Sequence, residues 1–442
     1  MKSDIQSLEK KAGKLLESGQ LVKALVIYNQ ILDLIADKES TQYAINYGHI
    51  GIISLMQEDF NKSVEIFLII QEQLKKNVGE KSEEYLSSLK TLSEIYEAKN
   101  DYNNALATNK ELLTLTKEIG GMISEDYAIV LEDKARIYKK SGSYNQSIKI
   151  YNQVLKLKLK VFGMESEEYS LTLNNLASAY QYTCNYIQAL VLYNQSLTIK
   201  EKISGRVTDG YAITLENIAT IFSDQGFYDK ALTKLLEAKA IKEKCELEDN
   251  QSYINTLYNI ANLYIFQVEY KKARVLYNQV LKIKAETVGK LSDSYTTSLD
   301  YIAKLNLIEG KNDLALKVYQ ECYDISKQIG VNNNNCGYFL HSMSEIYEQQ
   351  GRIPEALNIL QESLDITDLN MGKDNISYAT TLFNLSSMGY EYQRGLGKKK
   401  NKLEYYKYLQ GIIQANQTAF EVGGKYEDLY MASNDYIKRN KL

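Results

Sequence analysis

The middle of the chain contains the stretch Tyr169-Ser-Leu-Thr-Leu-Asn-Asn-Leu-Ala-Ser-Ala-Tyr180, followed after a four-residue gap by Asn185-Tyr-Ile-Gln-Ala-Leu190. The tyrosine that opens this stretch returns every 42 residues, at Tyr43, Tyr85, Tyr127, Tyr211, Tyr253 and Tyr295. An Ala-Leu pair, or a close equivalent, returns at the same interval from Ala105 to Ala315. Two linked elements therefore repeat together, and such a period predicts a repeat architecture.

The first element of each unit has the pattern of an amphipathic helix. Apolar residues stand four, seven, eight and eleven positions after the tyrosine, as in Leu173, Leu176, Ala177 and Tyr180, and this spacing marks one face of an α-helix. The position eight after the tyrosine is always small, which allows a neighbouring helix to approach closely. A Ser, Thr or Asn stands three positions before the tyrosine position and predicts the N-cap of each helix: Ser82, Ser124, Ser166, Thr208, Asn250, Ser292, Asn333 and Asn375.

The second element is also helical, with an aromatic residue four positions after the Ala-Leu pair. Neither helix can bury its apolar face alone, so stacked helix pairs must share a continuous core. The fold class predicted is therefore all-α, a right-handed αα-superhelix of about ten helix-pair repeats. We expect residues 1–390 to form a single solenoid and residues 391–442, where the register is lost, to form C-terminal capping helices.

The composition argues against nucleic-acid binding, secretion and membrane insertion. The chain has 442 residues, 44% hydrophobic and 24% charged, with a formal net charge of −4, which gives no bulk attraction to nucleic acid. The N-terminus lacks the apolar core of a secretory signal, and no apolar run is long enough to insert into a membrane. Four cysteines without a paired C-x-x-C spacing are expected to be reduced thiols. We therefore expect a cytoplasmic protein.

The quoted residues resemble a tetratricopeptide repeat, above all Leu173-Asn-Asn-Leu-Ala-Ser-Ala-Tyr180 with Asn185-Tyr-Ile-Gln-Ala-Leu190. The 42-residue step and the linker Leu157-Lys-Leu-Lys-Val-Phe-Gly163 are similar to the long-linker repeats of kinesin light chains and nephrocystin-type proteins. The resemblance covers nearly the whole chain. It implies a superhelix whose first helices line a concave groove that binds protein or peptide.

In that geometry, side chains two, five, six, nine and twelve or thirteen positions after the tyrosine face the groove. Asparagines stand six positions after it in three successive repeats, and an amide that both donates and accepts suits the backbone of an extended peptide. In the resembling family, asparagines at this position hold ligand main chain. The candidate binding residues are Asn174, Asn175, Asn217, Asn259, Asn262, Arg136, Lys139, Tyr182 and Tyr258.

A structural alternative stays open: the asparagines ladder between adjacent helices and the charges form a solvated face. We expect no enzyme, no cofactor and no metal site. His49 and His341 stand too many repeats apart to share a metal, Cys184 is expected to be an exposed thiol in place of the inter-helix glycine, and Cys322 a buried one.

Two functions fit the sequence. The first is an interaction scaffold or adaptor that binds a partner protein or an extended peptide in the concave groove. The alternative is a ligand-gated regulator that senses a short signalling peptide by changing the pitch of the superhelix. Neither nucleic acid nor membrane insertion is expected, and the oligomeric state stays open.

Overall fold

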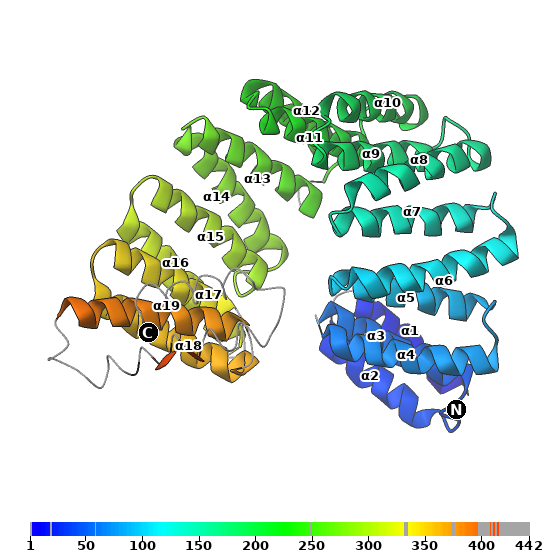
Figure 1. The fold of residues 1–442 in the computed structure, drawn as a ribbon, viewed down its shortest axis with the longest axis horizontal. Coiled ribbons are helices and arrows are strands. Elements are labelled where there is room, and N and C mark those ends of the chain that lie inside the picture. Colours follow the sequence, from blue (N-terminus) through cyan, green and yellow to red (C-terminus); the bar gives the residue numbers. More distant parts are fainter. Residues whose placement is uncertain are drawn as a thin grey trace. The chain divides into compact units, whose positions relative to one another are not determined.

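The computed structural model describes residues 2–17, 20–57, 59–247, 250–330, 335–373 and 376–396, together with positions 407, 410, 411, 413 and 414. The regular secondary structure of the described residues is entirely helical, and its nineteen continuous α-helices are labelled in Figure 1. Odd-numbered helices are the first of each pair and are called A helices; even-numbered helices are the second and are called B helices. The predicted all-α solenoid of helix pairs is confirmed.

The chain divides into two compact units, Met1–Ile241 and Lys242–Leu442, and each is described by itself. The first unit contains α1 (Lys2–Glu17), α2 (Leu21–Leu34), α3 (Thr41–Met56), α4 (Phe60–Asn77), α5 (Glu83–Ala98), α6 (Tyr102–Gly120), α7 (Glu125–Lys140), α8 (Tyr144–Val161), α9 (Glu167–Tyr182), α10 (Tyr186–Ser204), α11 (Asp209–Asp224) and most of α12 (Tyr228–Lys244). The second contains α13 (Gln251–Phe266), α14 (Tyr270–Thr287), α15 (Asp293–Ile308), α16 (Asn312–Ile329), α17 (Asn335–Gln349), α18 (Ile353–Met371) and α19 (Ile376–Gly395).

Two boundaries expected from the sequence are not decided by this description. A single solenoid over residues 1–390 stays a prediction. The expected capping helices of 391–442 begin within the end of α19, and apart from Leu396 and the five isolated positions the rest of that segment lies outside the described residues.

Six of the eight predicted helix starts are confirmed by their caps. Ser82, Ser124, Ser166, Thr208 and Ser292 each accept a hydrogen bond from the backbone N–H of the tyrosine three residues later, at 3.2 or 3.3 Å. Each cap satisfies one of the N–H groups that a helix start leaves without an intrahelical partner. Asn250 caps α13 through Ser252, while Asn333 and Asn375 lie outside the described residues.

Each helix pair packs where small residues cross. In α3 and α4, Ser63 Oγ donates to the Gly51 carbonyl at 2.8 Å, and in α7 and α8, Ser147 Oγ donates to the Ala135 carbonyl at the same distance. Large tyrosines of the B helices are almost fully buried, among them Tyr28, Tyr151, Tyr193, Tyr277 and Tyr319. The periodic tyrosines of the B helices are therefore core residues, which bury a large apolar area.

Four buried lysines recur at the repeat interval, near the ends of successive B helices: Lys158, Lys200, Lys242 and Lys284. The ammonium groups of the first three donate to the carbonyl ten residues later, in the first turn of the next A helix. Lys200 Nζ also lies 2.9 Å from Thr214 Oγ1. A buried ammonium is tolerated only when acceptors surround it, so Lys158 and Lys200 join α8 to α9 and α10 to α11 across the linkers, whereas Lys284 donates to Gln251 Oε1 of the preceding A helix.

The buried ammonium of Lys200 makes the folding stability depend on pH. Burial lowers the pKa of Lys200 from 10.5 to about 8, so the folded protein binds fewer protons than the unfolded chain between these two values. Folding stability therefore rises with pH across that window, and the cost of burying the charge is fully present below pH 8. We expect the unfolding free energy of the wild type, relative to Lys200→Met, to rise by about 2 kcal/mol from pH 8 to pH 10.

Urea unfolding of both proteins at the two pH values measures this difference. Lys202→Met is the matched control, because the Lys202 side chain is solvent-exposed on the same helix. A wild-type advantage that is the same at both pH values would mean that the Lys200 ammonium is not penalised by burial.

Candidate functional site on the A helices

Several A helices of the first unit contact each other directly, α3 with α5, α7 with α9, and α9 with α11, and an ion pair between Glu97 and Arg136 joins α5 to α7. Their side chains therefore form one surface, which we call the A face. Residues two, six, nine and thirteen positions after each repeat tyrosine lie along it, because these offsets follow one stripe of a helix. The candidate residues on α7, α9 and α11 all belong to this surface or to its edge.

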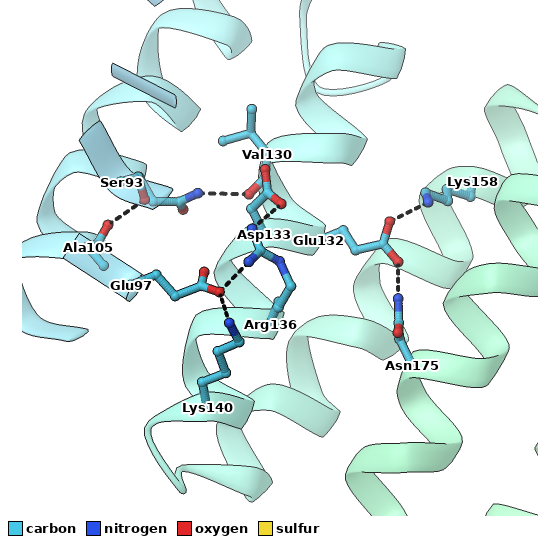
Figure 2. Close-up of polar contacts among 11 residues, drawn as sticks. Ser93, Glu97, Ala105, Val130, Glu132, Asp133, Arg136, Lys140, Lys158 and Asn175 are labelled. Atoms are coloured by element: carbon cyan, nitrogen blue, oxygen red, sulfur yellow. Dashed lines mark hydrogen bonds and ion pairs between the residues drawn. The ribbon is translucent and has the colours of Figure 1, made fainter. Parts of the chain in front are cut away.

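Glu132 is the centre of a polar network on this surface (Figure 2). Its carboxylate pairs with the buried ammonium of Lys158 and accepts hydrogen bonds from Thr172 Oγ1 at 2.9 Å and Asn175 Nδ2 at 3.1 Å. Three contacts thus converge on one carboxylate: the Lys158 pair joins α7 to α8 within one repeat, and the two hydrogen bonds join it to α9 of the next repeat. Two predicted site residues are engaged in such links, because buried Asn174 also donates its amide, to Thr214 Oγ1 at 2.9 Å.

The other asparagines of the row are in different surroundings. Asn217 on α11 is half-buried and Asn259 on α13 is exposed, and neither side chain has a hydrogen bond to a described residue. Asn262, also exposed, accepts a hydrogen bond from Tyr277 Oη at 2.8 Å. Asn174 and Asn175 therefore form hydrogen bonds between adjacent repeats, as the structural alternative expects. Asn217, by contrast, keeps a free amide on the A face of the first unit.

The predicted basic residues link repeats as well. Arg136 pairs with Asp133 at 2.9 Å and with Glu97 of the preceding A helix (Figure 2). Glu97 is only 3% exposed and also pairs with Lys140 at 2.6 Å. Lys139 Nζ lies 3.3 Å from Ser178 Oγ of the next A helix. Burial, together with the Arg136 and Lys140 charges, lowers the pKa of Lys139.

The two predicted tyrosines differ in their exposure. Tyr182 is 59% exposed and its ring stacks on that of Tyr144, with ring centroids 5.0 Å apart and planes inclined by 3°. Tyr258 in the second unit is half-buried, donates to Ser298 Oγ at 3.0 Å and lies with its ring centroid 4.3 Å from that of Tyr301. Only Tyr182 presents most of its side chain to solvent.

One feature of the A face was not predicted from the sequence. Ile129, Leu171 and Ile213 stand two positions after the repeat tyrosine on α7, α9 and α11, and they are 37, 45 and 39% exposed. They form an aliphatic row, four residues along each helix from the row Asp133, Asn175 and Asn217. The signal was an apolar residue at the same groove position in three successive repeats, and solvent-facing apolar residues in a row are typical of binding surfaces.

In the described part of the chain, no group of three or more His, Cys, Asp or Glu side chains could hold a metal ion. None of the described helices is long and apolar enough to cross a membrane. His49 and His341 lie in different units. Cys184 is exposed and Cys322 buried, as predicted, and all four cysteines are free thiols.

Comparison with known proteins gives the family. The family model described as tetratricopeptide repeat matches residues 126–202, 210–286 and 293–368, which together make up just over half of the chain. A search of curated proteins found no match.

Solved structures with a similar fold share little sequence with the chain. A kinesin light chain-like repeat protein of Podospora anserina is 20% identical and has a TM-score of 0.39, over 46% of this chain and 96% of that one. BtubC of P. vanneervenii is 19% identical, with a TM-score of 0.41, over 52% and 91%. The quorum sensor NprR of B. thuringiensis, in its apo form, is 17% identical, with a TM-score of 0.46, over 83% and 99%.

The repeat period, the capped A helices and the small residues at the helix crossings agree with the family match. The chain belongs to the tetratricopeptide repeat family.

Proposed function

We propose that this protein is an interaction scaffold or adaptor that binds a partner protein, or an extended peptide segment of one, on the A face of its first unit. The observation that carries the proposal is the free amide of Asn217 beside the aliphatic row Ile129, Leu171 and Ile213. An amide without a protein partner can donate a hydrogen bond to a peptide backbone and accept one from it. Covering exposed aliphatic side chains with a partner removes apolar surface from water, which favours binding. The proposal gives the protein no chemistry of its own and places it in the cytoplasm.

The network around Glu132 supports this proposal indirectly. Glu132 binds Asn175 of the next repeat and Lys158 binds the Glu168 carbonyl there, which fixes the two repeats relative to each other. A surface whose residues are already ordered loses less entropy when a partner binds. Asn175 and Arg136 then position the A face, whereas Asn217 contacts the partner.

Photo-crosslinking tests the proposal directly. A photoreactive amino acid is placed at Thr220, exposed on α11, and in a second protein at Thr198, exposed on the B helix α10. We expect a discrete crosslinked partner from position 220 and none from position 198 when the protein is illuminated in its native lysate. Crosslinks of equal yield and pattern from both positions would rule out the A face as the binding surface.

Asn217→Ala and Asn175→Ala separate binding from structure, because they occupy equivalent positions in adjacent repeats. Asn217→Ala is expected to leave the melting temperature unchanged and to weaken binding of the crosslinked partner by about 1 kcal/mol, the contribution of a typical hydrogen bond. Asn175→Ala is expected to lower the melting temperature, because Glu132 loses a donor. Calorimetric melting and titration of the purified partner measure both. A lower melting temperature for Asn217→Ala would show that its amide is structural.

A further inference from the structure

A pocket of about 310 Å³ opens in the first unit between α3, α4 and α5. Its floor is apolar, formed by Phe67, Ile70 and Leu74 of α4, and its walls include Ile45 and Ile52 of α3. The volume is in the range of pockets that take small ligands or single side chains, and an apolar lining favours an apolar guest. Ile45, at the mouth, is 44% exposed and stands two positions after a repeat tyrosine, where Ile129, Leu171 and Ile213 stand in later repeats.

The pocket exists because one side chain is missing. Gly48 lines it and stands five positions after the repeat tyrosine, where the following repeats have Lys90, Glu132, Asn174 and Glu216. A Cβ built at position 48 would lie 3.3 Å from Ile70 Cδ1, so a larger residue would occupy the space above the floor. A glycine inside a helix costs about 1 kcal/mol relative to alanine, and here that cost leaves an open cavity.

The rim of the pocket is acidic. Glu83 and Glu84 line it from the first turn of α5, both exposed, and neither carboxylate has an ion pair with a described residue. Acidic first turns occur on other A helices, for example Glu125 and Asp126 on α7, because a helix N-terminus stabilises negative charge. Only their coincidence with an apolar cavity distinguishes Glu83 and Glu84.

No basic group of the described residues lines the pocket to neutralise that rim, since its lining contains no lysine or arginine. His49, in the wall, stacks on Tyr28 with ring centroids 4.8 Å apart, and its Nδ1 is buried without a hydrogen-bond partner among the described residues. Burial lowers the pKa of His49, so its imidazole is neutral at physiological pH. The pocket therefore offers an apolar floor to an aliphatic guest and an unpaired negative rim to a cation.

We propose that this pocket receives a branched aliphatic side chain of the partner, and that a lysine or arginine next to that side chain pairs with Glu83 and Glu84. The inference rests on the proposed function, because it names what the A face recognises at its α3–α5 end. The aliphatic side chain supplies affinity by leaving water. The carboxylates supply selectivity, because a partner with an acidic residue at the same point would be repelled.

The test uses the full chain with labelled isoleucine δ1-methyl groups and the probe acetyl-Ala-Ala-Leu-Lys-Ala-Ala-amide. We expect the probe to shift the methyl signals of Ile45, Ile52 and Ile70 in NMR spectra. Two analogues, with glutamate in place of lysine and with alanine in place of leucine, are each expected to bind at least tenfold more weakly. No shift of these three signals up to the solubility limit of the probe, or equal binding of the glutamate analogue, would overturn the proposal.

Matched variants test whether the probe binds at the pocket or is attracted by the net charge of the protein. Glu83→Gln with Glu84→Gln is expected to weaken the lysine probe at least tenfold, while Glu125→Gln with Asp126→Asn, the same positions on an A helix outside this pocket, leaves it unchanged. Gly48→Leu fills the cavity and is expected to abolish binding of the probe. If this variant has a lower melting temperature than the wild type, the result for Glu83→Gln with Glu84→Gln tests the proposal instead. Equal loss in the α7 control would mean that net charge, not the rim, attracts the probe.

The crosslinking experiment separates failure of this inference from failure of the proposed function. A native partner that crosslinks at position 220 and binds Gly48→Leu as tightly as the wild type would leave the A face as the binding surface and remove the pocket from it.

Discussion

Replacing Glu132 by glutamine is expected to lower the free energy of unfolding by about 3 kcal/mol, the cost of leaving a buried charge without its partner. Lys158 is the reason: its side chain is 5% exposed, and Glu132 is the carboxylate that it pairs with. Glutamine preserves the size of the side chain and one oxygen acceptor for Thr172 and Asn175, but its NH2 group takes the place of the oxygen that accepts from Lys158, so the ammonium loses both the opposite charge and an acceptor. Urea unfolding monitored by circular dichroism measures the loss.

A double-variant cycle tests the cause. Lys158→Met combined with Glu132→Gln is expected to recover most of the lost stability, since an apolar side chain in place of the ammonium leaves no charge to compensate. The exposed pair Lys202–Glu165 is the matched control; Glu165→Gln should cost less than about 1 kcal/mol, as is usual for surface ion pairs. A double variant as unstable as Glu132→Gln alone would show that Glu132 acts through its hydrogen bonds and not its charge.

The local signals in the sequence predicted the local structure well. Ser124 and Thr208 cap their helices as expected, because a cap depends on residues only three positions apart. Gly142, fifteen positions after its tyrosine, has φ of +77°, and Cys184 has φ of +58° at the equivalent position. Both are in the left-handed region that suits the end of a helix.

The candidate site was harder to predict because its contacts join different repeats. The row of asparagines appears uniform in sequence, but the side-chain amides differ in their partners. The Asn175 amide donates a hydrogen bond to a glutamate 43 residues earlier, whereas the Asn217 amide has no hydrogen bond to a described residue. The difference lies in what faces each amide from the neighbouring repeat, which the 42-residue pattern does not contain. A period identifies equivalent positions, but it does not identify their partners.

The buried lysines show the same limit. Lys200 stands on a B helix among other charged residues, and charged side chains are almost never fully buried unless they are paired. Its burial follows from two acceptors, the Gly210 carbonyl and Thr214 Oγ1, which the next A helix supplies. The pocket at Gly48 was also missed, because a glycine in a helical pattern signals a weak helix former before it signals a cavity.

Two glycines three residues apart on α3 should respond oppositely to alanine. A Cβ at Gly51 would lie 2.7 Å and 2.9 Å from two ring carbons of Phe67, and Phe67 is buried. The backbone of α3 has little freedom to retreat there, because the Gly51 carbonyl accepts the 2.8 Å hydrogen bond from Ser63. Overpacking of this kind costs about 1–3 kcal/mol.

At Gly48, by contrast, the nearest atom to an added Cβ is Ile70 Cδ1 at 3.3 Å, the end of a side chain that borders the open pocket and has room to shift. Alanine then gains helix propensity, up to about 1 kcal/mol. We expect Gly51→Ala to destabilise the protein by about 2 kcal/mol, whereas Gly48→Ala leaves it as stable as the wild type or slightly more so. Urea unfolding of both variants measures the contrast. Equal destabilisation would mean that the space above Ile70 is closed, and the acidic-rimmed pocket would then lose its opening.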